Sequence, residues 1–185
     1  MLQLPNCKSG RNKLAVLLIM VAATLPALVA CGDGEQRASD FDITMYQGGG
    51  EIADQQTSLD GVLAKGKPVV LNFWAGQCPP CVAEMPELEV AWQFYRDDIV
   101  LLGVDVGPSF GLGSFEDGRN LLHQIGVTYP AGNSSSPGIA RDFGMTGLPG
   151  TFFITPDGTV RDSWVGAIRP AQLNRRIDDL IEAAK

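Results

Sequence analysis

Two cysteines, Cys78 and Cys81, lie just after a run of apolar residues, and this arrangement limits the folds that the chain can adopt. Residues 68–75 read Pro-Val-Val-Leu-Asn-Phe-Trp-Ala, which has the length and composition of a strand buried on both faces. From Pro79 onward, apolar residues recur at spacings of three and four, as on the buried face of a helix: Val82, Met85, Leu88, Trp92 and Tyr95. We therefore expect a strand, a short turn and a helix, with Cys78 at the exposed start of the helix.

The spacing of the pair restricts its chemistry. A disulfide between residues three positions apart closes too small a loop to stabilise a fold. Covalent haem attachment requires His after the second Cys, where this chain has Val82. A structural zinc site needs two further ligands, and the only His is His123, which we expect on a helix surface. No metal is therefore expected, and redox chemistry remains.

The predicted position of each cysteine suggests its role. Unpaired N–H groups and the positive end of the helix dipole stabilise a thiolate at a helix N-terminus, which lowers the pKa of Cys78. Cys81 lies one turn later and faces the interior, where it can attack a mixed disulfide formed on Cys78. Pro79 and Pro80 fit between them because proline is tolerated in a first helical turn. No cofactor is needed beyond a redox-active Cys78–Cys81 disulfide.

The first thirty residues have the pattern of an export signal. Residues 1–13 are polar and basic, and residues 14–30 are mostly apolar, on the short side for a bilayer span. This run ends Leu-Val-Ala before Cys31 and resembles the lipobox of bacterial lipoproteins, which implies that Cys31 is lipidated and becomes the new N-terminus. The alternative is an ordinary signal peptide or an uncleaved anchor. We expect a signal peptide over 1–30, a polar tether over 31–40 and a domain over 41–185, on the extracytoplasmic side of the cell envelope.

Charge excludes a large class of partners. The basic residues before Cys31 are Lys8, Arg11 and Lys13, and the remaining chain carries 11 basic and 21 acidic residues. A surface this acidic repels phosphate backbones and anionic lipid headgroups, so no nucleic-acid partner is expected.

The residues around the cysteines carry a family resemblance. Residues 73–81, Phe-Trp-Ala-Gly-Gln-Cys-Pro-Pro-Cys, with Pro86 beyond them, resemble the active site of the thioredoxin fold, and more narrowly that of the TlpA/ResA/DsbE-like thiol-disulfide oxidoreductases. Residues 147–154, where Pro149 precedes an apolar strand, are the second family mark. The resemblance covers residues 41–185. It implies a membrane-tethered enzyme that reduces disulfides of envelope proteins, an apocytochrome c among them, with electrons from a membrane donor. We expect the protein to be a monomer.

The resemblance also implies roles for single residues. Pro149 is cis in the family and, with Leu148 before it, helps dock the substrate backbone; the family usually has Thr next, where this chain has Gly150. Glu84 matches an acid beside the redox pair, the alternative being a solvated charge on the helix. Asn72 replaces the buried Asp of thioredoxin, either as a hydrogen-bonding core residue or in a proton path. Trp74 covers the disulfide in this fold, or else only packs in the core.

The rest of the chain predicts the same fold class, an α/β thioredoxin-like fold with a mixed central sheet, an N-terminal extension and a central insertion. Residues 99–106 form a second buried strand pattern, and 151–155 and 159–165 flank a hairpin turn. Helices are expected over 115–125, 136–143 and from Pro170, with capping boxes at Thr57/Asp60 and Ser114/Asp117. The loop 107–113 is expected to be mobile or to contact a partner protein.

Two other functions remain open. A peroxiredoxin-like peroxidase shares the fold, but that class has Thr three residues before its reactive Cys, where this chain has Ala75. A non-enzymatic copper chaperone of the Sco type has three residues between its cysteines, whereas two separate Cys78 and Cys81.

Overall fold

In the computed structural model, residues 36–185 are described except Ala53. They form a mixed sheet of seven strands in the order β2-β1-β5-β4-β3-β6-β7. The strands are β1 (Asp42–Gln47), β2 (Gln56–Ser58), β3 (Val69–Trp74), β4 (Val100–Asp105), β5 (Ala131–Asn133), β6 (Gly150–Ile154) and β7 (Val160–Val165). β3, β4 and β5 are parallel, and the remaining pairings are antiparallel.

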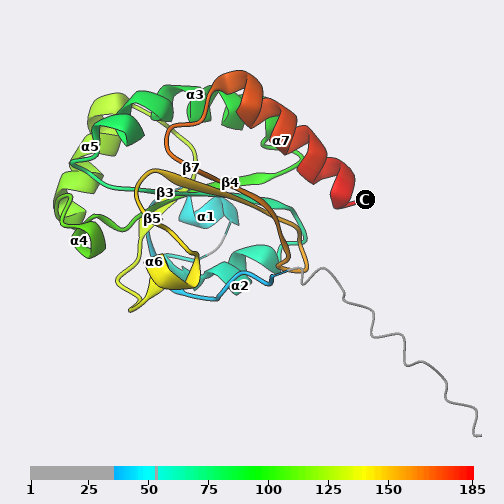
Figure 1. Ribbon diagram of the computed structural model, residues 1–185, viewed down its shortest axis with the longest axis horizontal. Helices are drawn as coiled ribbons and strands as arrows, with labels where there is room; N and C mark the ends of the chain where they lie inside the picture. The colour runs from blue at the N-terminus through cyan, green and yellow to red at the C-terminus, as the bar shows by residue number, and fades with distance from the viewer. Residues whose placement is uncertain (1–35, 53) are drawn as a thin grey trace, which may run out of the picture. The chain divides into compact units, whose positions relative to one another are not determined.

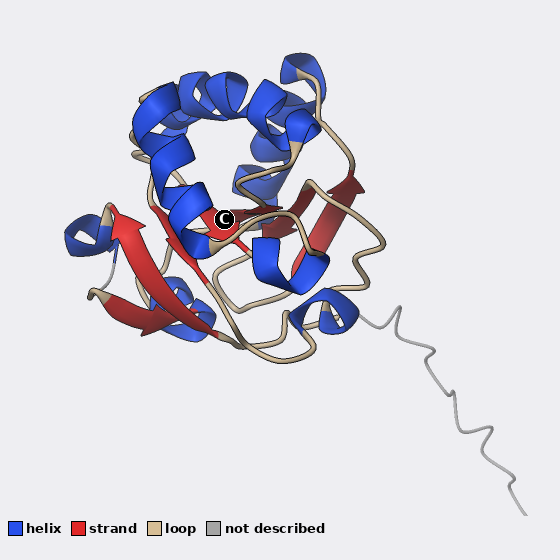
Figure 2. Ribbon diagram, turned by 90° about the vertical axis from the view of Figure 1, so that its left-hand side faces the viewer, coloured by secondary structure: helices blue, strands red, loops and turns tan. Residues whose placement is uncertain are grey.

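Helices cover both faces of the sheet (Figures 1 and 2). They are α1 (Gly49–Ile52), α2 (Leu59–Leu63), α3 (Pro79–Tyr95), α4 (Gly107–Phe110), α5 (Phe115–Ile125), α6 (Ile139–Asp142) and α7 (Pro170–Ala183). Buried side chains of α3, α5 and α7 share one core cluster, and those of α1, α2 and α6 share a second on the opposite face. The predicted α/β class with a mixed sheet and flanking helices is confirmed.

The central strand β3 supplies side chains to both clusters. All six of its residues are buried, as its unbroken apolar pattern predicts. Val70 and Trp74 enter the cluster under α3, whereas Val69, Leu71 and Phe73 enter the other. Because strand side chains alternate, Asn72 lies on the α3 side with Trp74.

Several local predictions differ from the structure by a few residues. The capping box of Ser114 and Asp117 is present and starts α5 where expected. For α2, however, the N-cap is Ser58 rather than Thr57, and its side chain accepts from the Gly61 N–H. The helix expected over 136–143 shortens to α6, whose N-cap is Gly138 at φ 81°. Residues 107–110 form α4 instead of an irregular loop.

The first described residues, 36–38, form hydrogen bonds and an ion pair with the rest of the domain. The Ala38 N–H donates to the Gly158 carbonyl at 2.8 Å, and the Val160 N–H donates to the Gln36 carbonyl at 2.9 Å. Arg37 forms an ion pair with Asp60 at 2.6 Å. Residues 36–40, expected within a tether, are thus part of the folded domain, because they pair with the β6–β7 hairpin turn.

Other predictions concern residues that are not described. The signal peptide and Cys31 lie outside the described residues. Within the described part of the chain, no helix is long and apolar enough to cross a membrane.

Candidate active site

The cysteine pair lies where β3 passes into α3. Cys78 is the N-cap of α3 and Pro79 is its first residue. Cys78 and Cys81 form a disulfide, with their Cα atoms 5.3 Å apart. A strand that ends at a tight turn and continues as a helix therefore places both sulfur atoms in the first helical turn.

Both cysteines are buried in this oxidised form, which corrects the expectation of an exposed Cys78. Cys78 is 2% exposed and Cys81 is 0% exposed. Both belong to the core cluster under α3, and Leu112 and Leu148 pack against that cluster from two loops. The burial of both cysteines in this cluster is not revealed by the helix pattern alone.

The turn before Cys78 is held by the segment that follows β4. The Gln77 N–H donates to the Leu112 carbonyl at 2.9 Å, and the Gln77 side chain donates to Asp117 at 3.4 Å. Gly76 packs so closely that a Cβ there would lie 2.6 Å from the Gly118 nitrogen. The loop predicted as mobile or as a partner contact is therefore a support of the active-site turn.

Pro149 lies beside the same turn. The Leu148–Pro149 peptide bond is cis, as the family resemblance implies. Gly150 starts β6 and pairs with Phe73 of β3, so Pro149 lies level with the end of β3. The Pro149 carbonyl accepts a hydrogen bond from the Gly166 N–H at 2.8 Å, which joins this loop to the connection between β7 and α7.

Glu84 is buried below the disulfide-bearing turn. It is 3% exposed, so the alternative of a solvated helix charge is wrong. The Asn72 side chain donates to Glu84 Oε1 at 2.8 Å, and the Ile168 N–H donates to Glu84 Oε2 at 3.0 Å. Burial raises the pKa of Glu84 to about 7, although these two hydrogen bonds lower it in part. An acid with this pKa can give or take a proton near neutral pH.

Asn72 is a fully buried hydrogen-bonding residue. Besides Glu84, its amide nitrogen donates to Thr151 Oγ1 at 3.1 Å. Among the described residues, its Oδ1 atom has no hydrogen-bond partner. Since Asn72 is joined to Glu84, it holds the acid in place from the neighbouring strand.

Trp74 is fully buried and packs in the core. A Cβ on Gly103 would lie 3.0 Å from Trp74 Nε1 and 2.9 Å from the Tyr129 ring, so the glycine leaves room for both aromatic side chains. Trp74 also lies against Gly118 of α5. The contacts of its indole are those of a core residue, within the same cluster as the two cysteines.

A second buried acid, Asp105, was not predicted as part of the site. It is 0% exposed at the end of β4, in register with Trp74. Its carboxylate accepts from the Gly107 N–H at 2.8 Å and from the Tyr46 hydroxyl at 3.1 Å. Burial raises the pKa of Asp105 to about 6. The available signal was an acid inside an otherwise apolar strand pattern.

His123 is exposed on α5, as predicted. Apart from the undescribed residues, the chain shows no group of three or more His, Cys, Asp or Glu side chains placed to hold a metal.

The sequence is similar to those of known proteins. The sequence model of the AhpC/TSA family matches residues 35–163. The thiol-disulfide oxidoreductase ResA of Oceanobacillus iheyensis is 29% identical over 94% of this chain and 92% of its own length. The thioredoxin-like protein YneN of Bacillus subtilis is 29% identical over 77% of this chain and 78% of its own length.

Solved structures share the fold. A thiol:disulfide interchange protein of the thioredoxin family from Chlorobium tepidum superposes with a TM-score of 0.63 at 23% identity, over 80% of this chain and 97% of that chain. The chain thus belongs to the AhpC/TSA family, and it is a thiol-disulfide oxidoreductase.

Proposed function

We propose that the protein is a membrane-tethered reductase of disulfides in envelope proteins, acting outside the cytoplasm through Cys78 and Cys81. The observation that carries this proposal is the disulfide at the start of α3 with the buried acid Glu84 one turn beyond it. Apocytochrome c is the proposed substrate class, and a membrane protein is the proposed electron donor. The enzyme is proposed to act as a monomer, with no bound cofactor.

The reaction begins with the reduced pair. The Cys78 thiolate attacks one sulfur of the substrate disulfide, a mixed disulfide forms, and the other substrate sulfur leaves as a thiolate that takes up a proton. The Cys81 thiol gives its proton to Glu84, and its thiolate attacks Cys78 Sγ. The second substrate sulfur then leaves as a thiolate and is protonated. Two electrons pass to the substrate, and the enzyme keeps the Cys78–Cys81 disulfide until the donor returns two electrons.

The position and the pKa of Glu84 both suit it to accept the proton of Cys81. Cys81 and Glu84 are three residues apart on α3, so their side chains lie on the same face of the helix. A pKa of about 7 keeps Glu84 partly deprotonated at neutral pH, so that it can accept the Cys81 proton and later return it. Asn72 positions this carboxylate through its 2.8 Å hydrogen bond.

Pro149 and Leu148 are proposed to dock the substrate backbone. Pro149 lies next to the end of β3, from which the turn leads to Cys78. Leu148 is half-buried and contributes to both core clusters, so it fixes the loop while leaving part of its surface open.

The anchor is proposed to be a lipid on Cys31. The support is the sequence pattern around residue 31 and the start of the folded domain only five residues later, at Gln36. Mass spectrometry of the protein from native membranes should find an N-terminal lipidated Cys31 and no residues 1–30. An unmodified Cys31 peptide would end the lipoprotein assignment.

Trapping tests the activity and identifies the substrate. A Cys81→Ser variant should accumulate mixed disulfides through Cys78, because the second attack is removed. The matched Cys78→Ser variant should form no mixed disulfide with substrate, because it lacks the attacking thiol. Peroxide consumption by the wild-type protein at a rate above its disulfide reduction, with no trapped protein, would instead favour a thiol peroxidase.

A further inference from the structure

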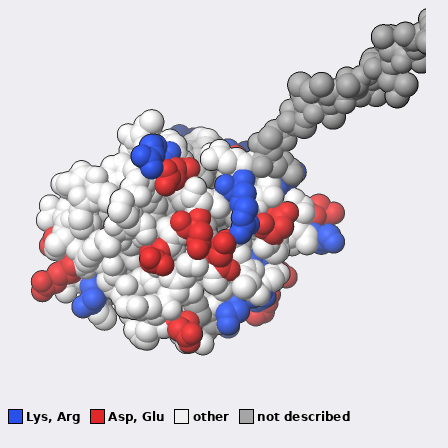
Figure 3. Space-filling view, turned by 90° about the horizontal axis from the view of Figure 1, so that it is seen from below, with Lys and Arg blue, Asp and Glu red and all other residues white. Residues whose placement is uncertain are grey.

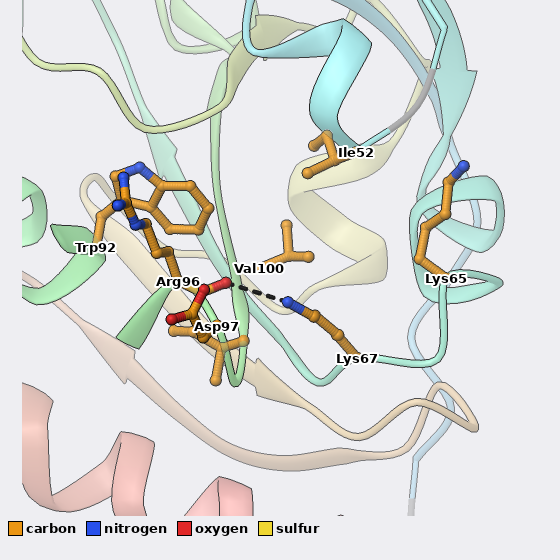
Figure 4. A pocket seen from close by; sticks show the side chains of 8 residues that line it. Ile52, Lys65, Lys67, Trp92, Arg96, Asp97 and Val100 are labelled. Carbon is orange, nitrogen blue, oxygen red and sulfur yellow. Dashed lines mark hydrogen bonds between the residues drawn. The ribbon is translucent and has the colours of Figure 1, made fainter. Parts of the chain in front are cut away.

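A pocket with basic walls lies at the end of the sheet where β3 and β4 begin. It has a volume of about 370 Å³ and is lined by Lys65 and Lys67 after α2, by Arg96 after α3, and by apolar side chains that include Trp92 and Val100 (Figure 4). The Lys67 ammonium donates to the Arg96 carbonyl at 3.1 Å, so the two segments that carry the cations are joined across the pocket.

The three cations at this pocket lack carboxylate partners. Within the described residues, none of them has a carboxylate within 4.0 Å, although Asp97 also lines the pocket. Ion pairs are formed by other basic residues of the domain, among them Arg37, Arg141, Arg176 and Lys185.

The surroundings make this concentration of positive charge unusual. The chain as a whole has 21 acidic and 14 basic residues, and acidic side chains are spread over the face in Figure 3. Three cations without a carboxylate partner at one pocket of an acidic protein point to an anionic ligand.

The pocket lies at the same end of the sheet as the point where the chain enters the domain. Val69 of β3 is paired with Val100 on one side and with Ile154 on the other. The turn just after Ile154 is the one that binds residues 36–38. Two strand spacings, about 10 Å, separate the start of β4 from the end of β6.

The redox pair lies at the opposite end. β3 runs from Val69 to Trp74 and then turns to Cys78, and a strand of six residues spans about 17 Å. In Figure 1, α4 and α5, which support that turn, lie at one end of the domain, and the C-terminus of α7 lies at the other.

The length of the preceding segment places this end near the membrane. The five residues from Cys31 to Gln36 can span at most about 18 Å. An anchor at Cys31, which is part of the proposed function, therefore keeps the chain's entry point close to the headgroups. An uncleaved apolar leader that ends at residue 30 would do the same.

We propose that the pocket of Lys65, Lys67 and Arg96 binds the phosphate of an anionic phospholipid headgroup in the membrane that carries the anchor. Three cations and a charged phosphate are complementary, and each Lys or Arg close to an anionic surface strengthens binding by about fivefold. This contact orients the domain so that the end of the sheet where β3 and β4 begin faces the membrane. Cys78 and Cys81 consequently face away from it.

Lysine footprinting of the anchored protein tests this proposal. The full protein, purified from membranes, is placed in vesicles of phosphatidylcholine alone or mixed with phosphatidylglycerol, and is treated with a water-soluble acylating reagent. After residue 31 the chain has three lysines, Lys65, Lys67 and Lys185, so Lys185 is the internal reference. Lys65 and Lys67 should be acylated at least fivefold more slowly with phosphatidylglycerol, relative to Lys185, and high salt should abolish the difference.

Two variants and a control with free inorganic phosphate test whether the protection comes from a headgroup bound in this pocket. Arg96→Gln should reduce the protection by about fivefold, whereas Arg175→Gln, an exposed Arg on α7 outside the pocket, should not. Equal acylation in both vesicle types would overturn the proposal. Equal protection by millimolar inorganic phosphate without vesicles would also overturn it, because the pocket would then bind a free anion.

Disulfide reduction measured on the same samples tests the proposed function independently of the proposed headgroup site. An active, anchored enzyme without protection refutes only the headgroup site. Protection in an enzyme that reduces no disulfide refutes only the proposed function.

Discussion

The Glu84→Gln substitution should change how the stability of the protein depends on pH. Glu84 is buried, and its pKa in the folded state is about 7, against 4.5 for the unperturbed side chain. A raised pKa means that the folded protein favours the protonated acid. The stabilisation is therefore complete below pH 4.5 and is lost as the pH rises through 7.

The size of the effect follows from the two pKa values. Each unit of pKa corresponds to about 1.4 kcal/mol, so the ionisation of Glu84 should cost about 3 kcal/mol of folding free energy between pH 4.5 and pH 8. A glutamine has the same shape and can accept from the Ile168 N–H, but it does not ionise. Glu84→Gln should therefore gain about 3 kcal/mol relative to wild type as the pH rises across this range.

Urea unfolding of the oxidised protein at a series of pH values measures this difference. Asp105 also has a raised pKa, of about 6, so both proteins should lose stability between pH 4 and pH 6. The informative quantity is the difference between the two free energies of unfolding. The matched control is Glu87→Gln, which changes an exposed carboxylate of the same helix and should follow wild type. Parallel curves for wild type and Glu84→Gln would refute the assignment of a buried, raised-pKa acid.

Three further predictions concern the redox turn and its support. In the reduced protein, Cys78 should be alkylated before Cys81, because Cys78 is at the helix start; faster alkylation of Cys81 would reverse their roles. The reduction potential should lie nearer about −270 mV than about −120 mV, because Pro79 and its neighbour Pro80 have no N–H to stabilise a thiolate and Glu84 adds negative charge nearby. A potential above about −180 mV in a glutathione buffer would instead identify an oxidant or isomerase. Gly118→Ala should cost about 1–3 kcal/mol in urea unfolding, because its Cβ would overlap the buried carboxylate of Asp105. Gly50→Ala, where a Cβ meets open space, is the control, and an equal loss there would refute the packing argument.

The parts of the fold that could be predicted from the sequence are those encoded locally. β3 is an unbroken apolar run, and α5 starts where the side chains of Ser114 and Asp117 satisfy each other's backbone N–H groups. The redox pair needed only a strand, a turn and a helix in succession. Each of these signals lies within a few residues of the structure it determines.

The surroundings of the pair could not be predicted in the same way, because they depend on residues far apart in the chain. Glu84 reads as one more charge on a helix, and its carboxylate accepts a hydrogen bond from the N–H of Ile168, which is 84 residues away. The core cluster that contains Cys78 also includes residues from distant parts of the chain, and Leu112 and Leu148 pack against this cluster from two loops. Asp105 likewise depends on Tyr46, which is 59 residues away.

The connection between β7 and α7 contacts both Glu84 and the loop of Pro149, which is proposed to dock the substrate. Gly166 donates to the Pro149 carbonyl and Ile168 donates to Glu84, so two residues of one short segment contact both places. Loss of the Glu84 proton places a negative charge on the group that accepts from the Ile168 N–H, so the strength of this hydrogen bond depends on the protonation of Glu84. Thermodynamic linkage is reciprocal, so a substrate that binds more tightly when Glu84 is protonated must raise the pKa of Glu84 by the same free energy. The affinity for such a substrate and the pKa of Glu84 are then thermodynamically coupled.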